Sequence, residues 1–186
     1  MTTPTLVFIS GGVRSGKSSY AENLSIQIAD ETNSHLHYIA TGVPSDQEME
    51  ERIKMHKDQR LTQNKKWITW EKADGIGELA PHFNHRDVLL LDCLTTLVNN
   101  EFFLNTGETV DCIENRIFTS IERLQHKCHT LIVVSNEVFF DTTYDTKLVL
   151  PYKKLLGRLH QRIVKQASYA FRVEFGTPIK MKGDSL

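Results

Sequence analysis

The chain has 186 residues, of which 40% are hydrophobic, and a formal net charge of -1. This length and composition predict one domain, 1–186, with a substantial core, and argue against a disordered protein or one that coats nucleic acid. No apolar stretch reaches the roughly 20 residues that a bilayer-spanning helix needs, and no basic leader precedes the first apolar run. The three cysteines are scattered without a C-x-x-C pair, which favours reduced thiols in the cytoplasm.

Short apolar runs alternate with segments of helical periodicity along the chain. Apolar runs predict strands at 6–9, 36–40, 66–71, 88–91, 131–134 and 170–175. Helical patterns cover 17–29, 45–58, a segment from about Thr95, 111–127 and 153–166. The charged segment 44–66 is expected at the rim. This alternation predicts an α/β fold, with a mainly parallel sheet covered by helices on both faces.

The segment after the first predicted strand matches the phosphate-binding P-loop pattern G-x-x-x-x-G-K-[ST]. It lies between a strand and a helix, which is the context that this motif needs. Backbone N–H groups of such a loop surround phosphate oxygens, and the helix N-terminus adds partial positive charge. The candidate nucleotide-binding residues here are Gly11, Gly12, Val13, Arg14, Ser15, Gly16, Lys17 and Ser18.

Three side chains around this loop have predicted roles. Lys17 is a candidate catalytic residue that reaches the outer phosphates, and we expect it to face solvent when no nucleotide is bound. The Ser18 hydroxyl is a candidate Mg²⁺ ligand. Asp92 closes the buried run 88–91, which is the usual place for a second Mg²⁺ ligand, although an ordinary helix cap before Thr95 explains an acid there as well.

Further motifs in the same order resemble one enzyme family. They are Y-I-A-T at 38–41, R-I-K-M-H-K at 52–57, W-I-T-W-E at 67–71, D-C-L-T-T at 92–96, N-E-V at 136–138 and G-T-P-I-K at 176–180. Together with the P-loop they are similar to the bifunctional adenosylcobinamide kinase/adenosylcobinamide-phosphate guanylyltransferases of cobalamin biosynthesis. The resemblance spans nearly the whole chain.

The resemblance implies a cytoplasmic enzyme with two steps. A kinase step moves the γ-phosphoryl group of ATP or GTP to a hydroxyl of adenosylcobinamide. A histidine then attacks the α-phosphorus of GTP, and the guanylyl group passes to the corrinoid phosphate. The family's R-x-x-x-H-[KR] segment places this histidine at His56. Neutral imidazole is a reasonable nucleophile near pH 7. Without the matching neighbourhood, the sequence alone favours a surface histidine of an amphipathic helix at His56.

Other positions follow from the resemblance. A nucleotide-contacting turn falls on Thr41, Gly42 and Val43, and a guanine-nucleotide segment falls on Lys57, Asp58, Gln59 and Arg60. Glu71 is a candidate partner for the guanine N1–H and N2–H₂ donors, with a solvated strand-edge glutamate as the alternative. The family suggests Mg²⁺ as cofactor, no nucleic-acid partner and a homo-oligomer, specifically a trimer.

The C-terminal half departs from the family pattern in three places. His160 stands where the family usually has asparagine, Phe139-Phe140 replaces a glycine-rich stretch, and 150–154 lacks the usual R-x-F-R-D. A basic stripe, defined as Lys154, Arg158, Arg162 and Lys165, is either a solvated face or a phosphate or subunit contact. A P-loop kinase of another small metabolite and a family-derived nucleotide-binding protein without transferase activity remain alternatives.

Overall fold

The computed structural model describes residues 4–42, 65–104, 107–137 and 146–184. Its strands are β1 (Thr5–Gly11), β2 (His35–Ala40), β3 (Trp67–Glu71), β4 (Asp87–Asp92), β5 (Thr130–Asn136), β6 (Tyr169–Glu174) and β7 (Thr177–Lys182). Its helices are α1 (Lys17–Thr32), the 3-10 helix η1 (Ile76–His82), α3 (Leu94–Leu104), α4 (Val110–Gln125) and α5 (Thr146–Gln166). Within these ranges no helix is long and apolar enough to cross a membrane.

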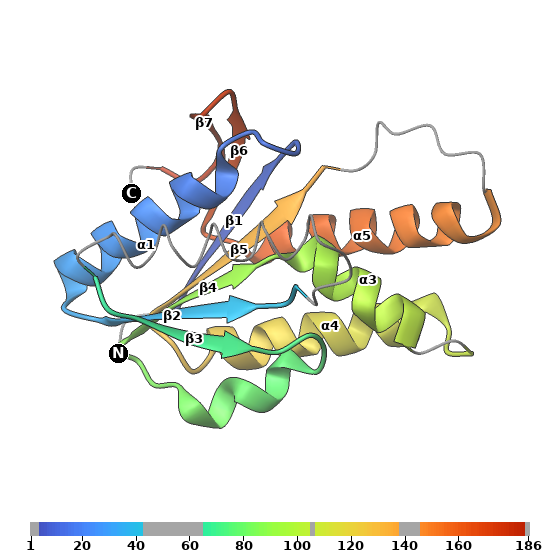
Figure 1. The fold of residues 1–186 in the computed structure, drawn as a ribbon, viewed down its shortest axis with the longest axis horizontal. Coiled ribbons are helices and arrows are strands. Elements are labelled where there is room, and N and C mark those ends of the chain that lie inside the picture. Colours follow the sequence, from blue (N-terminus) through green and yellow to red (C-terminus); the bar gives the residue numbers. More distant parts are fainter. Residues whose placement is uncertain (1–3, 43–64, 105–106, 138–145, 185–186) are drawn as a thin grey trace.

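The strands form one sheet in the order β3-β2-β4-β5-β1-β6-β7 (Figure 1). The first six strands in this order pair in parallel. Among the strands of the described residues, β7 alone is antiparallel, and it pairs with β6. The predicted α/β fold with a mainly parallel sheet is therefore confirmed.

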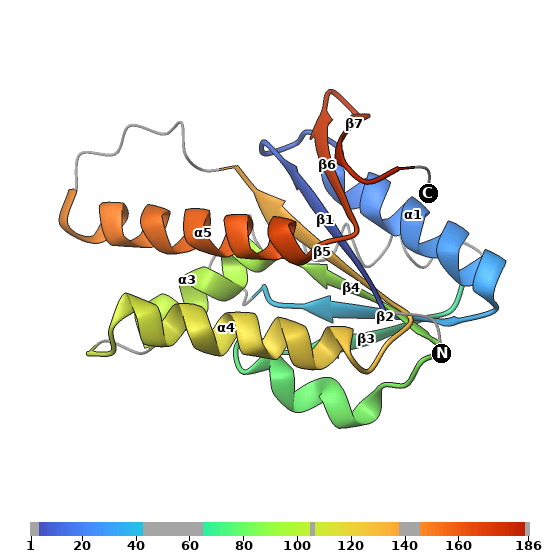
Figure 2. The ribbon, with the colours of Figure 1, turned by 180° about the vertical axis from the view of Figure 1, so that it is seen from behind.

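Helices cover both faces of the sheet. In Figure 1 α1 lies over one face, and the reverse view in Figure 2 shows α3, α4 and α5 over the other. The buried apolar side chains form two clusters, one on each face of the sheet. One apolar cluster packs α1 residues such as Leu24 and Ile28 against alternate strand residues, and a larger cluster packs η1, α3, α4 and α5 against the opposite face. The central strands are buried on both faces, which explains their continuous apolar runs.

Two elements of the structure are absent from the sequence-based prediction. η1 contains Pro81 and is short, and β7 is exposed at nearly every position, so neither carries the apolar periodicity on which the prediction rested. The strand expected at 170–175 ends at Glu174, because Phe175 lies in the turn before β7. The helix expected at 45–58 lies outside the described residues.

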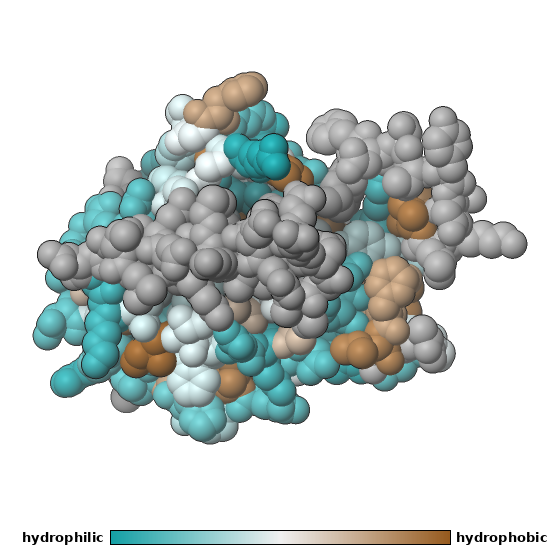
Figure 3. Space-filling view, in the orientation of Figure 1, coloured by the Kyte–Doolittle hydropathy of each residue, from teal (hydrophilic) through white to brown (hydrophobic). Residues whose placement is uncertain are grey.

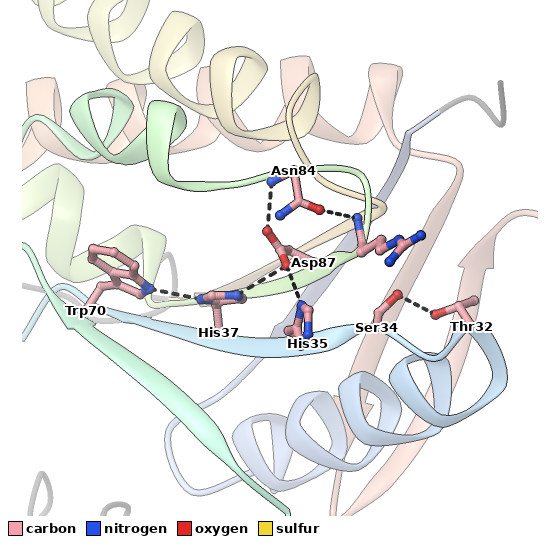
Figure 4. Close-up of polar contacts among 8 residues, drawn as sticks. Thr32, Ser34, His35, His37, Trp70, Asn84 and Asp87 are labelled. Carbon is pink, nitrogen blue, oxygen red and sulfur yellow. Dashed lines mark hydrogen bonds and ion pairs between the residues drawn. The ribbon is translucent and has the colours of Figure 1, made fainter.

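The amino ends of β2 and β4 are joined by a polar cluster around the buried Asp87 (Figure 4). Its Oδ1 lies 3.2 Å from His35 Nδ1 and 3.4 Å from His37 Nε2, and its Oδ2 accepts from the Asn84 backbone N–H. Trp70 Nε1 donates to His37 Nδ1, so Nε2 is the protonated nitrogen of a neutral His37. Burial lowers the pKa of His37, while the Asp87 carboxylate acts in the opposite direction.

The predicted basic stripe on α5 is partly neutralised within the chain. Arg158 pairs with Asp111 and Glu114 of α4, and Arg162 pairs with Glu114 and lies over the Phe118 ring. These contacts join α4 to α5. Two of the four residues of the stripe therefore have structural partners, which favours the interpretation of an ordinary helix face.

Candidate functional site

The predicted site residues gather at the carboxyl edge of the parallel strands. Gly11 of β1 is the register partner of Asn136 of β5, and Asp92 of β4 is the register partner of Ala40 of β2. Ala40 in turn is level with Glu71 of β3. Ligands of open α/β sheets bind outside this edge, so the fold brings the P-loop, Asp92 and Glu71 to one side of the molecule.

The P-loop backbone depends on its glycines. A Cβ on Gly11 would lie 2.6 Å from Ser15 Oγ and 2.6 Å from the Val173 carbonyl oxygen, so no side chain fits there. Gly16 has a φ of 89° and Arg14 a φ of 59°, both in the left-handed region. These values turn the chain back on itself, and Ser15 N donates to the Gly12 carbonyl across the loop at 3.2 Å.

The first turn of α1 leaves its backbone N–H groups available to an anion. Its N-cap is Gly16, which has no side chain, and the turn holds no acidic residue. The start of α4 is different, because the Thr109 side chain accepts from Cys112 N. An uncapped N-terminus that follows a glycine-rich loop is suited to phosphate binding.

Lys17 is buried, and the expectation that it faces solvent in the absence of nucleotide is wrong. Its side chain is 7% exposed, and Nζ donates to the Gly12 carbonyl at 3.2 Å. The Gly12 carbonyl therefore accepts from both the Lys17 ammonium and the Ser15 N–H. The positive charge is therefore held inside the cradle.

Asp92 and Ser18 offer oxygen ligands at the same edge. Asp92 Oδ2 accepts from the Tyr38 hydroxyl at 2.9 Å, which orients the carboxylate and leaves Oδ1 for another partner. Ser18 is half-buried in the first turn of α1. Within the described ranges no group of three or more His, Cys, Asp or Glu residues forms a metal cage. One carboxylate and one hydroxyl fit Mg²⁺, which binds through few protein ligands together with substrate phosphates.

The pKa of the Cys93 thiol depends on its burial and on nearby charged groups. Burial raises the pKa of its thiol, the adjacent Asp92 carboxylate raises it further, and the Lys17 ammonium acts against both. Cys93 follows Asp92 at the carboxyl end of β4, two strands from β1 and the P-loop in the sheet order.

The predicted nucleotide-contacting turn after β2 is held by its first residue. Thr41 is fully buried, and its hydroxyl donates to the Cys93 carbonyl and accepts from the Cys93 N–H at 2.9 and 3.0 Å. The half-buried Gly42 is then the accessible part of this turn. The remaining candidates of this region, Val43, His56, Lys57, Asp58, Gln59 and Arg60, lie outside the described residues.

Glu71 is exposed at the end of β3, the edge strand of the sheet. Four strand spacings separate β3 from β1, or about 19 Å at about 4.8 Å a step. Glu71 therefore does not share the phosphate cradle. Glu71 lies on the β3 side of the site, and Asp92 of β4 lies between it and the P-loop in the sheet order.

A hydrogen-bonded chain beneath the site was not predicted from the sequence. Thr95 Oγ1 lies 3.0 Å from Ser135 Oγ, which lies 2.7 Å from His160 Nε2. Thr95 Oγ1 also accepts from Asn136 N, and the Tyr152 hydroxyl donates to the Thr95 carbonyl. Burial lowers the pKa of His160 to about 4, so the ring is neutral. The replacement of the family's usual asparagine by His160 was visible in the sequence, but the residues that His160 contacts come from distant segments of the chain.

Two buried oxygens at this edge have no partner. They are Ser15 Oγ in the P-loop and Asn136 Oδ1 at the end of β5. The neighbouring Glu137 is engaged, because its Oε1 accepts from Ser10 Oγ and its N–H donates to the Gly11 carbonyl. Buried polar atoms are almost always paired, so unpaired ones beside the P-loop mark a place where a bound molecule completes the structure.

Comparisons with known proteins show which family the chain matches. Residues 7–181 match the family described as cobinamide kinase / cobinamide phosphate guanyltransferase. The chain is 32% identical to the bifunctional adenosylcobalamin biosynthesis protein CobU of Salmonella typhimurium, covering 95% of this chain and 99% of that protein. It is 31% identical to the Escherichia coli protein of the same name, with the same coverage.

A solved structure supports the fold independently. The flagellar accessory protein FlaH from Methanocaldococcus jannaschii aligns with a TM-score of 0.55 at 17% identity, covering 99% of this chain and 80% of that one. At this identity the likeness concerns the fold alone.

Proposed function

The chain belongs to the cobinamide kinase/cobinamide phosphate guanylyltransferase family, and we propose that the carboxyl edge of its sheet carries both activities. The family activities are those of a bifunctional enzyme of adenosylcobalamin biosynthesis. One domain, 1–186, holds both, and the P-loop binds the triphosphate in each step. The observation that carries this proposal is the cradle itself, with Lys17 buried inside the loop and bonded to the Gly12 carbonyl, at the same edge of the sheet as Asp92.

In the kinase step a hydroxyl oxygen of adenosylcobinamide attacks the γ-phosphorus of ATP or GTP. The bond from that phosphorus to the β–γ bridging oxygen breaks, and a nucleoside diphosphate leaves. Lys17 and the N–H groups at the start of α1 hold the negative charge that spreads over the phosphate oxygens. Ser18 and Asp92 would hold Mg²⁺, which supplies further positive charge beside the β- and γ-phosphates when bound.

In the guanylyl step an imidazole nitrogen of His56 attacks the α-phosphorus of GTP. The bond from the α-phosphorus to the α–β bridging oxygen breaks, and pyrophosphate leaves. A phosphate oxygen of adenosylcobinamide phosphate then attacks the same phosphorus, the P–N bond breaks, and adenosylcobinamide-GDP forms. The guanine lies on the Glu71 side of the site, where a carboxylate accepts from the N1–H and N2–H₂ groups. Lys57 and Arg60 offset charge on the phosphorus.

The family resemblance also carries proposals on assembly and location. We place the enzyme in the cytoplasm, where its three free cysteines, Cys93, Cys112 and Cys128, stay reduced. It works as a homo-oligomer, specifically a trimer, and its partners are nucleoside triphosphates and corrinoids.

The test is labelling with GTP that carries radioactive phosphorus at the α position. Wild-type protein becomes labelled and releases pyrophosphate, and the label is lost in acid but kept in base because protonated imidazole is a good leaving group. His56→Ala abolishes the label and guanylyl transfer while corrinoid phosphorylation continues. His126→Ala, which changes an exposed histidine after α4, keeps the label and serves as the matched control.

The other outcomes separate the alternatives. Label that persists in the His56→Ala protein places the nucleophile elsewhere. A wild-type protein that phosphorylates the corrinoid without taking up label is a kinase alone. A wild-type protein that binds GTP with neither activity is a nucleotide-binding relative of the enzymes.

A further inference from the structure

The turn between β6 and β7 lies against the P-loop. Glu174 pairs with Thr177, so Phe175 and Gly176 are the two central residues of the turn. Gly176 N donates to the Ser15 carbonyl at 2.8 Å, and a Cβ on Gly16 would lie 3.0 Å from Gly176 Cα. The turn is therefore fixed in place beside the phosphate cradle by backbone contact.

Phe175 is an unusual residue for this position. Its φ is 49° and that of Gly176 is 78°, and two-residue turns with positive φ at both positions favour Asn-Gly or Asp-Gly. A bulky residue is disfavoured there. Burial of the ring does not stabilise this conformation either, because the Phe175 side chain is 99% exposed. Figure 3 shows hydrophobic side chains at the tip of this hairpin. A residue that breaks local rules without compensation indicates a functional position.

The direction of the nucleotide follows from where the candidate ligand groups lie. Asp92 ends β4, and the unpartnered Asn136 Oδ1 lies at the end of β5, so we place the outer phosphates toward β4 and β5. The nucleoside of the same molecule then leaves on the opposite side of the loop. In the sheet order that side is β6 and β7, where Phe175 precedes the Gly176 whose N–H donates to the Ser15 carbonyl.

Glu71 lies on the other side of the P-loop. It ends β3, four strand spacings from β1, whereas β6 is the immediate neighbour of β1. One base position at Glu71 and another at Phe175 would thus flank the phosphate cradle on opposite sides. The two steps attack different phosphorus atoms of the triphosphate, so a nucleotide bound in two directions presents a different atom to each acceptor.

We propose that Phe175 is the base-stacking residue for the nucleoside triphosphate of the kinase step. This inference rests on the proposed function of the P-loop. An exposed aromatic face stacks on any nucleobase, since every base has a π-face, and it therefore fits ATP and GTP alike. The guanylyl step, with its base on the Glu71 side, does not use this ring.

The experiment compares Phe175→Asn with wild type in binding and in both half-reactions. Asparagine tolerates positive φ, so the turn is kept while the ring is lost. Without the stacking contact, the Kd for a non-hydrolysable ATP analogue and the kinase KM for ATP rise roughly tenfold. The Kd for inorganic triphosphate, which has no base, stays the same, and so does the rate of protein labelling by α-labelled GTP. Phe175→Trp restores affinity, and its fluorescence is quenched when the ATP analogue binds.

Met181→Ala is the matched control, because Met181 is an exposed apolar residue of the same hairpin away from the turn. We expect the Met181→Ala protein to bind ATP with wild-type affinity. Unchanged ATP affinity in Phe175→Asn overturns the proposal, and so does an equal loss of ATP and inorganic triphosphate, which would mean that the ring supports the loop. A loss of oligomer in sedimentation with normal ATP affinity also overturns it, and identifies the hairpin as a contact between copies.

Lys17→Ala separates this inference from the function on which it rests. If Lys17→Ala weakens the binding of inorganic triphosphate while Phe175→Asn leaves ATP binding unchanged, only the stacking proposal fails. If Lys17→Ala binds triphosphate normally, the P-loop assignment itself fails.

Discussion

The amino and carboxyl edges of the parallel sheet differ in how their polar side chains are paired. At the amino end, each carboxylate oxygen of the buried Asp87 has a partner. At the carboxyl end, Ser15 Oγ and Asn136 Oδ1 are buried without one, the P-loop holds a positive φ at Arg14, and the first turn of α1 is uncapped. Paired polar groups stabilise the fold, whereas unpaired groups and strained backbone are left for a ligand to complete.

The largest effect is expected for Lys17→Ala at the carboxyl end. Loss of the Lys17 ammonium from the cradle lowers both kinase and guanylyltransferase rates by roughly 10³-fold, since preorganised charge is worth most in a water-excluded site. The midpoint of thermal unfolding changes little, because the loss of the hydrogen bond to the Gly12 carbonyl is offset by the removal of a buried charge. Steady-state kinetics and calorimetry check this pair of results, and near-normal rates would reject the P-loop assignment.

Asp92→Asn is expected to lower both half-reactions by roughly 10²-fold. The variant keeps an acceptor for the Tyr38 hydroxyl but loses the negative charge, so the Mg²⁺ concentration needed for half-maximal rate rises. Direct measurement of Mg²⁺-dependent nucleotide binding gives a readout besides turnover. A fall in one activity alone would point to separate nucleotide sites.

Asp87→Ala tests the other end of the same strand. It leaves the Asn84 N–H and the His37 Nε2–H without acceptors, and we expect a loss of about 2–3 kcal/mol in the free energy of unfolding. The affinity for a nucleotide analogue at temperatures where the protein is folded stays at the wild-type value. Denaturant titration and binding measurements compare the two quantities, and a selective loss of affinity would contradict the structural role of this end.

The smallest effect concerns pH and His160. Burial puts its folded pKa at about 4, below the roughly 6.5 of an unfolded histidine, so the unfolded chain binds the extra proton first. Stability is full above pH 6.5 and falls as the pH drops toward 4, with about 2 kcal/mol lost between pH 7 and pH 5. His160→Asn reduces the dependence of the free energy of unfolding on pH while keeping a partner for Ser135. Urea titrations at several pH values measure it, and an unchanged slope would assign the acid sensitivity to other groups such as His37.

The sequence predicted the parts of this molecule that are encoded locally. Six strands and the P-loop follow from short apolar runs and one motif, and the boundaries differ from the structure by a few residues. The chain of contacts from Thr95 through Ser135 to His160 could not be predicted, because it joins three elements that only the folded sheet brings together. The distance of Glu71 from the P-loop depends on strand order, which the spacing of residues along the chain does not specify. The exposure of Phe175 escaped notice because a strand was expected to run through it.

The burial of Lys17 has a consequence for how tightly a triphosphate binds. A free lysine side chain has up to about 2 kcal/mol of rotamer entropy to lose when it is immobilised. Here the Gly12 carbonyl and the surrounding loop already hold the side chain in the free protein, so that entropy is lost during folding and not during binding. The arriving phosphates meet a charge that is preorganised, and the conformational cost appears in the stability of the apoprotein.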